Sequence, residues 1–162
     1  MRLIPTITAL IISTTTNYAQ PQEVVEENHP MPIYSSSDFL DDDAPFYAAD
    51  HALIMVSSDP IDSCTPCMEI YPTFSRLAEE SSLSAEKLHF AYVPTENWGL
   101  PNFSSLNSRV DGVPQIIHLY RGQEVGQDRI TSGGQGAIEP LEQLVEEITT
   151  QMVSGTSYIP SL

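Results

Sequence analysis

At residues 64–67 the chain reads Cys64-Thr65-Pro66-Cys67, and the segments on either side of this stretch decide the fold. The apolar run Ala52–Val56 comes before it, short and bounded in the way of a buried strand. After it, apolar residues recur at helical spacing: Cys67, Met68, Ile70, Tyr71, Phe74 and Leu77. The pattern predicts a strand, a short turn and a helix, with Cys64 at the N-terminus of the helix.

This position has a chemical consequence for Cys64. The unpaired backbone N–H groups and the dipole at a helix N-terminus favour an anion, here a thiolate. A thiolate is the nucleophile of disulfide exchange, and helix N-termini and Cys-x-x-Cys motifs lower a cysteine pKa from about 8.5 into roughly the 3.5–7.5 range. Cys67 lies one turn further along, close enough to attack a mixed disulfide formed at Cys64. These two cysteines, the only two in the chain, therefore predict a redox-active pair.

The stretch resembles the active site of the thioredoxin superfamily. Pro66 matches the proline before the second cysteine of that family, and Pro72 matches its kink proline in the active-site helix. Further along, Gly112, Val113 and Pro114 match the family's Gly-hydrophobic-Pro motif, whose proline is cis and faces the cysteines. A lone Cys-x-x-Cys is a moderate signal, whereas these motifs together in the family's order are a strong one.

The resemblance covers residues 31–151 and implies an α/β thioredoxin fold, a central mixed β-sheet flanked by helices on both faces. The residue patterns agree with that order of elements. Leu88–Val93 predicts a strand, and Ile116–Tyr120 with Glu124–Ile130 predicts a hairpin around Arg121 and Gly122. Ile138–Met152 predicts a closing amphipathic helix. Ligands of such sheets bind outside the carboxyl ends of the strands, where Cys64 is expected.

Three other segments have less regular patterns. Ile33 and Tyr34 suit a short edge strand. A helix is expected across Phe39–Tyr47, with Pro45 breaking or bending it. Phe103–Val110 suits another short helix.

The resemblance implies a thiol–disulfide oxidoreductase. Cys64 attacks a substrate disulfide and Cys67 resolves the mixed disulfide, while Val113 and Pro114 present backbone to an extended substrate peptide. Pro66 and Pro72 support the active site. No cofactor and no metal are expected, and the protein is expected to be a monomer. Its expected partners are protein thiols and disulfides and a membrane-bound redox protein. The absence of a His between the cysteines favours a reductase over a strong oxidant.

Two features depart from the family's pattern. Ser63 precedes the first cysteine, where thioredoxins usually carry Trp. The position of the family's buried aspartate aligns with Ser57 or Ser58, and that of its lysine neighbour with Tyr92. The acid that helps to deprotonate the second cysteine is therefore expected to be missing.

The N-terminal segment predicts export. Arg2 provides a positive charge, Leu3–Ile12 a short apolar core, and a polar stretch then ends at Ala19. This pattern predicts a signal peptide over residues 1–19 and delivery to a periplasm or into the secretory pathway and extracellular space. The alternative is an ordinary buried N-terminal strand. Residues 20–32 predict a disordered acidic linker containing prolines, residues 33–152 the domain, and residues 153–162 a flexible tail.

The charge of the chain restricts its partners. Its 162 residues include 22 acidic and 6 basic ones, a formal net charge of −16. Such a surface repels nucleic acid and anionic membranes and favours cationic or neutral partners, although a merely solvated surface has the same composition. No nucleic-acid partner is expected.

Two alternatives to an oxidoreductase stay open at this stage. Cys64 and Cys67 with Met68 or His118 would suit a soft metal such as Cu(I), which describes a metallochaperone. Alternatively, the domain is a non-enzymatic binding module whose Cys-x-x-Cys is a structural disulfide.

Overall fold

The computed structural model describes residues 31–35, 38, 43–95, 110, 112–131 and 133–155. The predicted signal peptide, most of the linker and most of the predicted tail lie outside these residues. The helix predicted over Phe103–Val110 also lies outside them, apart from its last residue. Within the described ranges, no helix has both the length and the apolar character that a membrane crossing requires.

The described strands form one mixed sheet in the order β2-β1-β3-β4. β1 (His51–Ser58) is parallel to β2 (Leu88–Thr95) and antiparallel to β3 (Gln115–Tyr120). β3 in turn pairs with the two-residue β4 (Gln123–Glu124) through a tight turn, in which Arg121 and Gly122 have φ of 48° and 75°. Left-handed conformations at both central residues suit a hairpin turn, so the predicted turn is confirmed.

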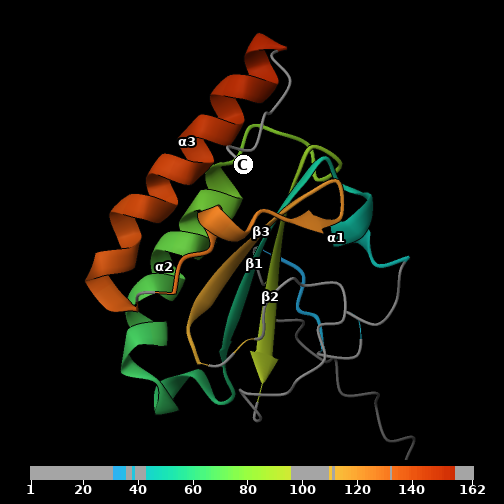
Figure 1. The fold of residues 1–162 in the computed structure, drawn as a ribbon. Coiled ribbons are helices and arrows are strands. Elements are labelled where there is room, and N and C mark those ends of the chain that lie inside the picture. Colours follow the sequence, from blue (N-terminus) through green and yellow to red (C-terminus); the bar gives the residue numbers. More distant parts are fainter. Residues whose placement is uncertain are drawn as a thin grey trace, which may run out of the picture.

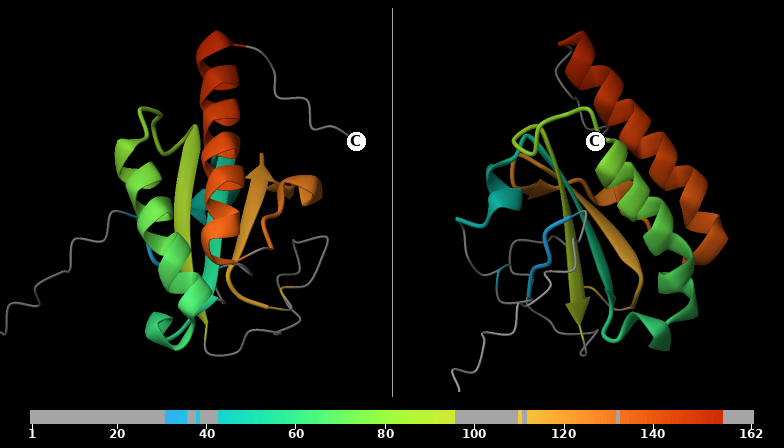
Figure 2. Two further views of the ribbon diagram at one scale, coloured as in Figure 1. Left: turned by 90° about the vertical axis from the view of Figure 1, so that its left-hand side faces the viewer. Right: turned by 180° about the vertical axis from the view of Figure 1, so that it is seen from behind.

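Helices cover both faces of this sheet, as predicted. α2 (Thr65–Glu80) and α3 (Ile138–Ser154) lie on one face, and the short α1 (Pro45–Ala48) lies on the other (Figure 1, Figure 2). Single 3₁₀ turns connect these elements at Ile61–Ser63, Gly126–Asp128 and Gly134–Ala137.

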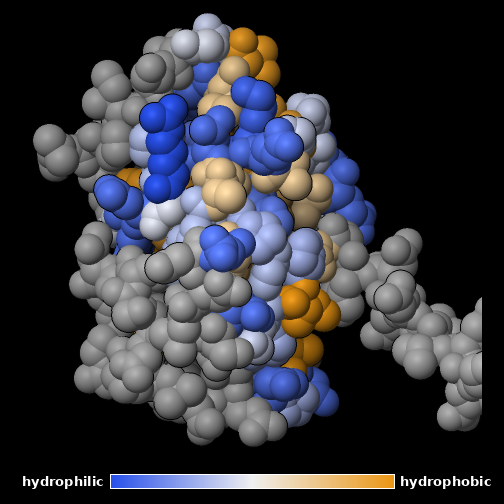
Figure 3. Space-filling view, turned by 90° about the vertical axis from the view of Figure 1, so that its right-hand side faces the viewer, coloured by the Kyte–Doolittle hydropathy of each residue, from blue (hydrophilic) through white to orange (hydrophobic). Residues whose placement is uncertain are grey.

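β1 is the central strand, and its first seven residues are buried. A strand with helices on both faces needs apolar side chains in both directions, which explains its nearly continuous apolar run. One core lies under α2 and α3 and includes Leu53, Met55, Phe74, Leu141 and Ile148. The other lies on the side of α1 and includes Phe46, Ala52, Ile54, Val56 and Ile117. Among the described residues on the α1 side of the molecule, apolar side chains appear at the surface in small groups among hydrophilic ones (Figure 3).

The expected break at Pro45 is confirmed, because the preceding Ala44 is extended, with φ −60° and ψ 136°, and α1 begins at Pro45. Proline suits the first position of a helix, where no backbone N–H is needed and its fixed φ is already helical. Phe39 and Leu40, the other end of the predicted helix, lie outside the described residues.

The prediction of a strand over Glu124–Ile130 is wrong in its middle. β4 ends at Glu124, the chain makes a 3₁₀ turn, and Ile130 alone returns to the sheet through a bridge with Ile116. The side chains of the loop explain this path, because Asp128 hydrogen-bonds the ring of His118 and Arg129 forms an ion pair with Glu124. These contacts replace the ladder that a continuous strand would have made.

The ends of the domain also differ from their predicted positions. Met31, placed in the linker by composition, is buried in the core under α2 and α3. Ile33 forms a single parallel bridge with Tyr92, as a minimal version of the predicted edge strand. At the other end, α3 continues through Ser154, two residues beyond its predicted end, and Gly155 closes it with a φ of 67°.

Candidate active site at the Cys64–Cys67 disulfide

Cys64 and Cys67 form a disulfide at the first turn of α2, with their Cα atoms 5.2 Å apart. Cys64 is the N-cap residue: its backbone is extended, with φ −131° and ψ 92°, and its Sγ accepts a hydrogen bond from the backbone N–H of Cys67 at 3.3 Å. The carbonyl of Cys64 accepts the first bond of the helix, from Met68 N–H at 3.0 Å. The helix therefore begins at the cysteine pair, as predicted.

The two sulfurs differ in accessibility. Cys67 is fully buried, whereas Cys64 is partly exposed at the end of the sheet where β1 and β2 finish. Thr65 and Pro66 between them are exposed. An incoming molecule can therefore reach the disulfide at Cys64, with Cys67 behind it.

The turn before Cys64 is held by two serine hydroxyls. Ser63 Oγ donates to the carbonyl of Pro60 at 2.7 Å and lies 2.7 Å from Ser58 Oγ. The peptide bond between Asp59 and Pro60 is cis, which had not been predicted. Ser63, noted in the sequence as a departure from Trp, thus joins the end of β1 to the turn that presents Cys64.

The predicted cis bond between Val113 and Pro114 is confirmed. Pro114 is buried and Val113 half-buried, directly before β3. A Cβ added to Gly133 would lie 2.5 Å from Pro66 Cβ and 3.2 Å from Pro114 Cδ. The cis-proline loop and the Cys-x-Pro-Cys turn therefore meet at Gly133, which brings these two predicted site residues together.

Gly133 was missed as a site residue in the sequence. Residues 133–136 contain three glycines, which had indicated only a loop without a phosphate-binding pattern. A glycine that allows close approach of two other segments has no local signature, because the need for it comes from residues far away in the chain. Only the order of the motifs, with this loop directly before the last helix, hints at it.

Pro72 lies inside α2 and is exposed on its surface, as the family's motif implies. Met68 is also exposed on this helix, with 41% of its surface accessible. The site as described thus has an accessible sulfur, a buried sulfur, a cis-proline loop beside them and an exposed methionine on the adjoining turn.

Ser57 and Tyr92 lie at the positions that align with the buried acid and lysine of thioredoxins. Ser57 is fully buried, whereas Ser58 is partly exposed, so Ser57 is the equivalent position. The Ser57 and Tyr92 hydroxyls form a hydrogen bond, and the ring of Tyr71 from α2 packs against that of Tyr92 with centroids 5.2 Å apart. Burial raises the pKa of Tyr92, and the negative charge of Asp59 raises it further. The hydrogen bond with Ser57 acts in the opposite direction. This pair is neutral.

His118, a ligand in the copper alternative, does not join the cysteines. It is fully buried and pairs with Leu53 across the ladder between β1 and β3, in the middle of the sheet. Its ring nitrogens bind His51 at 2.9 Å and Asp128 at 2.8 Å. Within the described part of the chain, no three His, Cys, Asp or Glu side chains are grouped in a way that would hold a metal ion.

The sheet order, a helix that begins at a Cys-x-Pro-Cys pair and a cis proline beside that pair define a thioredoxin fold. Solved structures of two thioredoxins agree. A thioredoxin variant from Halobacterium salinarum NRC-1 superposes with a TM-score of 0.53 at 22% identity, over 82% of this chain and 96% of its own. The thioredoxin of Malassezia sympodialis superposes with a TM-score of 0.52 at 17% identity, over 74% and 90%. No protein-family model matches the chain, and no curated protein matches it. The similarity therefore shows the fold.

Proposed function

We propose that this protein is a thiol–disulfide oxidoreductase that exchanges disulfides with other exported proteins. The observation that carries the proposal is the unequal pair at the start of α2, a partly exposed Cys64 bonded to a fully buried Cys67. A nucleophile needs access to its substrate, and a resolving thiol needs protection from other attackers. The disulfide also lies beside the cis-proline loop, where an extended peptide would meet the backbone of Val113 and Pro114.

The proposed reaction has two exchanges. In the reduced protein, the Cys64 thiolate attacks one sulfur of the substrate disulfide, and the other substrate sulfur leaves as a thiolate and takes up a proton. The Cys67 thiol then loses its proton and attacks Cys64 Sγ, which re-forms the Cys64–Cys67 disulfide and releases the second substrate thiolate. Two electrons pass from the protein to the substrate, and a dithiol reductant must return them. A membrane-bound redox protein is the proposed source.

Trapping tests this function directly. Without Cys67 the mixed disulfide at Cys64 is not resolved, so a Cys67→Ser variant should retain substrate proteins in bonds that dithiothreitol releases. Cys64→Ser is the matched control and should retain none, because its remaining thiol is buried. Equal retention by both variants, or no retention by either, would contradict the proposal.

A measured reduction potential separates this function from a structural disulfide. Structural disulfides of secreted proteins typically have potentials below about −300 mV. A value in that range together with empty trapping would favour the non-enzymatic binding module.

A further inference from the structure

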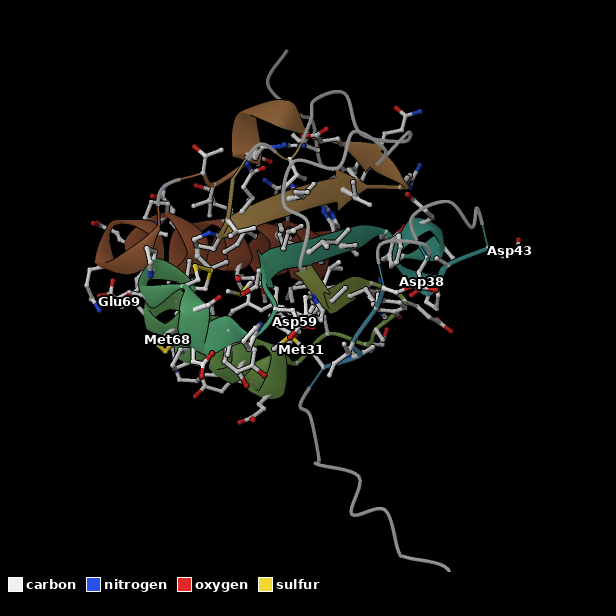
Figure 4. All side chains as sticks on the ribbon, turned by 90° about the horizontal axis from the view of Figure 1, so that it is seen from below. Met31, Asp38, Asp43, Asp59, Met68 and Glu69 are labelled. Carbon is white, nitrogen blue, oxygen red and sulfur yellow. A yellow bond between two sulfur atoms is a disulfide. The ribbon has the colours of Figure 1, made fainter. Side chains whose placement is uncertain are left out.

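The exposed acids that flank Cys64 in the chain have no cationic counterpart among the described side chains. Asp59 and Asp62 lie in the turn that leads into Cys64, and Glu69 lies on the second turn of α2. All three are exposed. In the view of Figure 4, Met68 and Glu69 lie next to each other on α2, and Asp59 lies further toward the middle of the molecule. We call Asp59, Asp62 and Glu69 the acidic rim of the disulfide.

Two of the described cations are already neutralised. Arg76 of α2 forms ion pairs with Glu80 at 2.7 Å and Glu142 at 2.5 Å. Arg129 has only 7% of its side chain exposed and forms an ion pair with Glu124 at 2.5 Å. Neither guanidinium can offset the charge of the rim.

The other two described cations lie at the far end of the sheet. Lys87 directly precedes β2, and Arg121 directly follows β3. Their neighbours Leu88 and Tyr120 both pair with His51, the first residue of β1, whereas the disulfide follows the last residue of β1. The negative field around Cys64 is therefore uncompensated by any described side chain.

This field acts on the chemistry as well as on the approach of a substrate. Attack requires an anion at Cys64 Sγ, and three neighbouring carboxylates oppose that charge while the helix N-terminus favours it. A substrate that brings a cation to the rim relieves this repulsion as it docks. A substrate that brings a carboxylate adds to it.

Resting on the proposed function, we propose that the acidic rim selects substrates whose reactive cysteine is flanked by lysine or arginine. Each exposed ion pair contributes only about 0.2–1 kcal/mol. A local surface field of one sign nevertheless raises the association rate of oppositely charged molecules, by up to about 10- to 1,000-fold at low ionic strength. The preference therefore lies in the second-order rate constant and weakens with salt.

The test uses the reduced full-length protein and three disulfide-linked peptides that differ only in having Lys, Gln or Glu beside the cysteine. Single-turnover rate constants are measured by stopped flow at low and at high salt. We expect the Lys peptide to react at least about tenfold faster than the Glu peptide at low salt. The ratio should fall to within about twofold when the Debye length shrinks to about 3 Å at 1 M salt.

A matched pair of variants locates the effect. The rim variant Asp59→Asn/Asp62→Asn/Glu69→Gln should lose the preference for the Lys peptide. The control Glu79→Gln/Glu86→Gln/Glu146→Gln removes three exposed acids elsewhere and should keep it. Equal rates for Lys and Glu peptides with the unmodified protein would overturn the inference, as would a preference that survives in the rim variant. If the Gln peptide is not exchanged at all, the proposed function itself fails.

Discussion

At the scale of single residues, Gly133 is the position at which the two loops of the candidate site come into contact. Its missing side chain allows Pro66 of the Cys-x-Pro-Cys turn and Pro114 of the cis-proline loop to come close to the same backbone position. Two of the three neighbouring atoms belong to the Pro114 ring and one to that of Pro66, and neither ring can rotate away as a flexible side chain would.

Gly133→Ala should therefore destabilise the protein and disturb the active site. A Cβ 2.5 Å from Pro66 forces a shift, and overpacking of this kind typically costs about 1–3 kcal/mol. Urea denaturation and the rate of disulfide exchange measure the two effects. Gly136→Ala is the matched control, because a Cβ there meets nothing within 4 Å, and its stability should change little. Equal stability of the two variants would show that Gly133 is not a close-approach position.

Alkylation of the reduced protein should distinguish its two thiols. The helix N-terminus stabilises a thiolate at Cys64, so its pKa should lie below that of a free thiol, whereas burial should raise that of Cys67. Alkylation rate against pH, with the modified residue identified by mass spectrometry, measures both. If Cys67 reacts first, or Cys64 titrates like a free thiol, the assigned roles are wrong.

Two buried histidines form a second polar cluster away from the disulfide. His51 Nδ1 lies 2.9 Å from His118 Nε2, and the two rings are stacked at an interplanar angle of 11°. The other ring nitrogen of His118 bonds Asp128 at 2.8 Å. Burial lowers the pKa of His51 to about 4, with the neighbouring His118 acting in the same direction. Burial also lowers the pKa of His118, whereas the hydrogen bond with Asp128 and the charge of that carboxylate raise it.

This cluster should make the protein less stable in mild acid. The unfolded chain takes up a proton at His51 below about pH 6.5, while the folded chain resists it until about pH 4. The free energy of unfolding should therefore fall between these two values, by up to about 3 kcal/mol from His51 alone. Urea titrations at pH 7, 6 and 5 measure this loss. His51→Asn should flatten the profile, and an equally steep profile in that variant would assign the loss to other groups.

At the scale of elements, segments with a clear period could be predicted from the sequence. β1, α2, β2 and α3 all lie where apolar runs or helical spacing placed them, because their own side chains form the core. Elements that depend on distant partners could not be predicted. The loop after β4 takes its path from the bond between Asp128 and His118, two residues whose contact no local pattern indicates.

The residues of the candidate site also fall into those that a local motif predicts and those whose role depends on distant contacts. Cys64 and Pro114 could be predicted because short motifs mark them, and both have the expected local geometry. Ser63 and Gly133 serve the site through contacts with Ser58, Pro60 and the two prolines. Such contacts exist only after folding, which is why the role of neither residue could be predicted from the sequence.

Pro72 should reduce the stability of α2. It has no N–H to donate to the carbonyl four residues earlier, and its ring crowds that carbonyl. Pro72→Ala should raise the free energy of unfolding by about 1–2 kcal/mol. This gain is smaller than the roughly 3 kcal/mol that a proline inside a helix costs, because alanine also gives the unfolded chain more conformational freedom and so stabilises it. Pro66→Ala is the comparison, since the first turn needs no such bond, and should give less. A less stable Pro72→Ala would show that the packing of α2 requires the proline.

At the scale of the whole molecule, the sequence predicts the amount of charge but not its distribution. Twenty-two acids in 162 residues indicate a preference for cationic or neutral partners. That Lys87 and Arg121 lie at the opposite end from the disulfide depends on the parallel pairing of β1 with β2 and the antiparallel pairing of β1 with β3. Topology thus converts an overall composition into a local field at one edge of the sheet.

The same field bears on the direction of electron flow. A strong oxidant, at about −120 mV, gains its power from a very stable reduced state with a highly acidic first thiol. Here the acidic rim opposes a thiolate at Cys64, and the sheet positions aligned with the buried acid and lysine of thioredoxins hold the neutral Ser57–Tyr92 pair rather than a cation. The rim disfavours the anionic reduced form and the neutral pair does not stabilise it, which favours a reductase.

We accordingly expect a reduction potential nearer to that of thioredoxin, about −270 mV, than to that of a strong oxidant. Equilibration of the protein with a series of glutathione ratios, followed by quantification of free thiols, measures it. The rim variant Asp59→Asn/Asp62→Asn/Glu69→Gln should shift the potential upward, because its thiolate is no longer opposed by three carboxylates, while the distant control variant should not. A potential above about −180 mV, in the range of an isomerase or oxidant, would overturn the assignment as a reductase. An unchanged potential in the rim variant would show that the acids act on the approach of substrates alone.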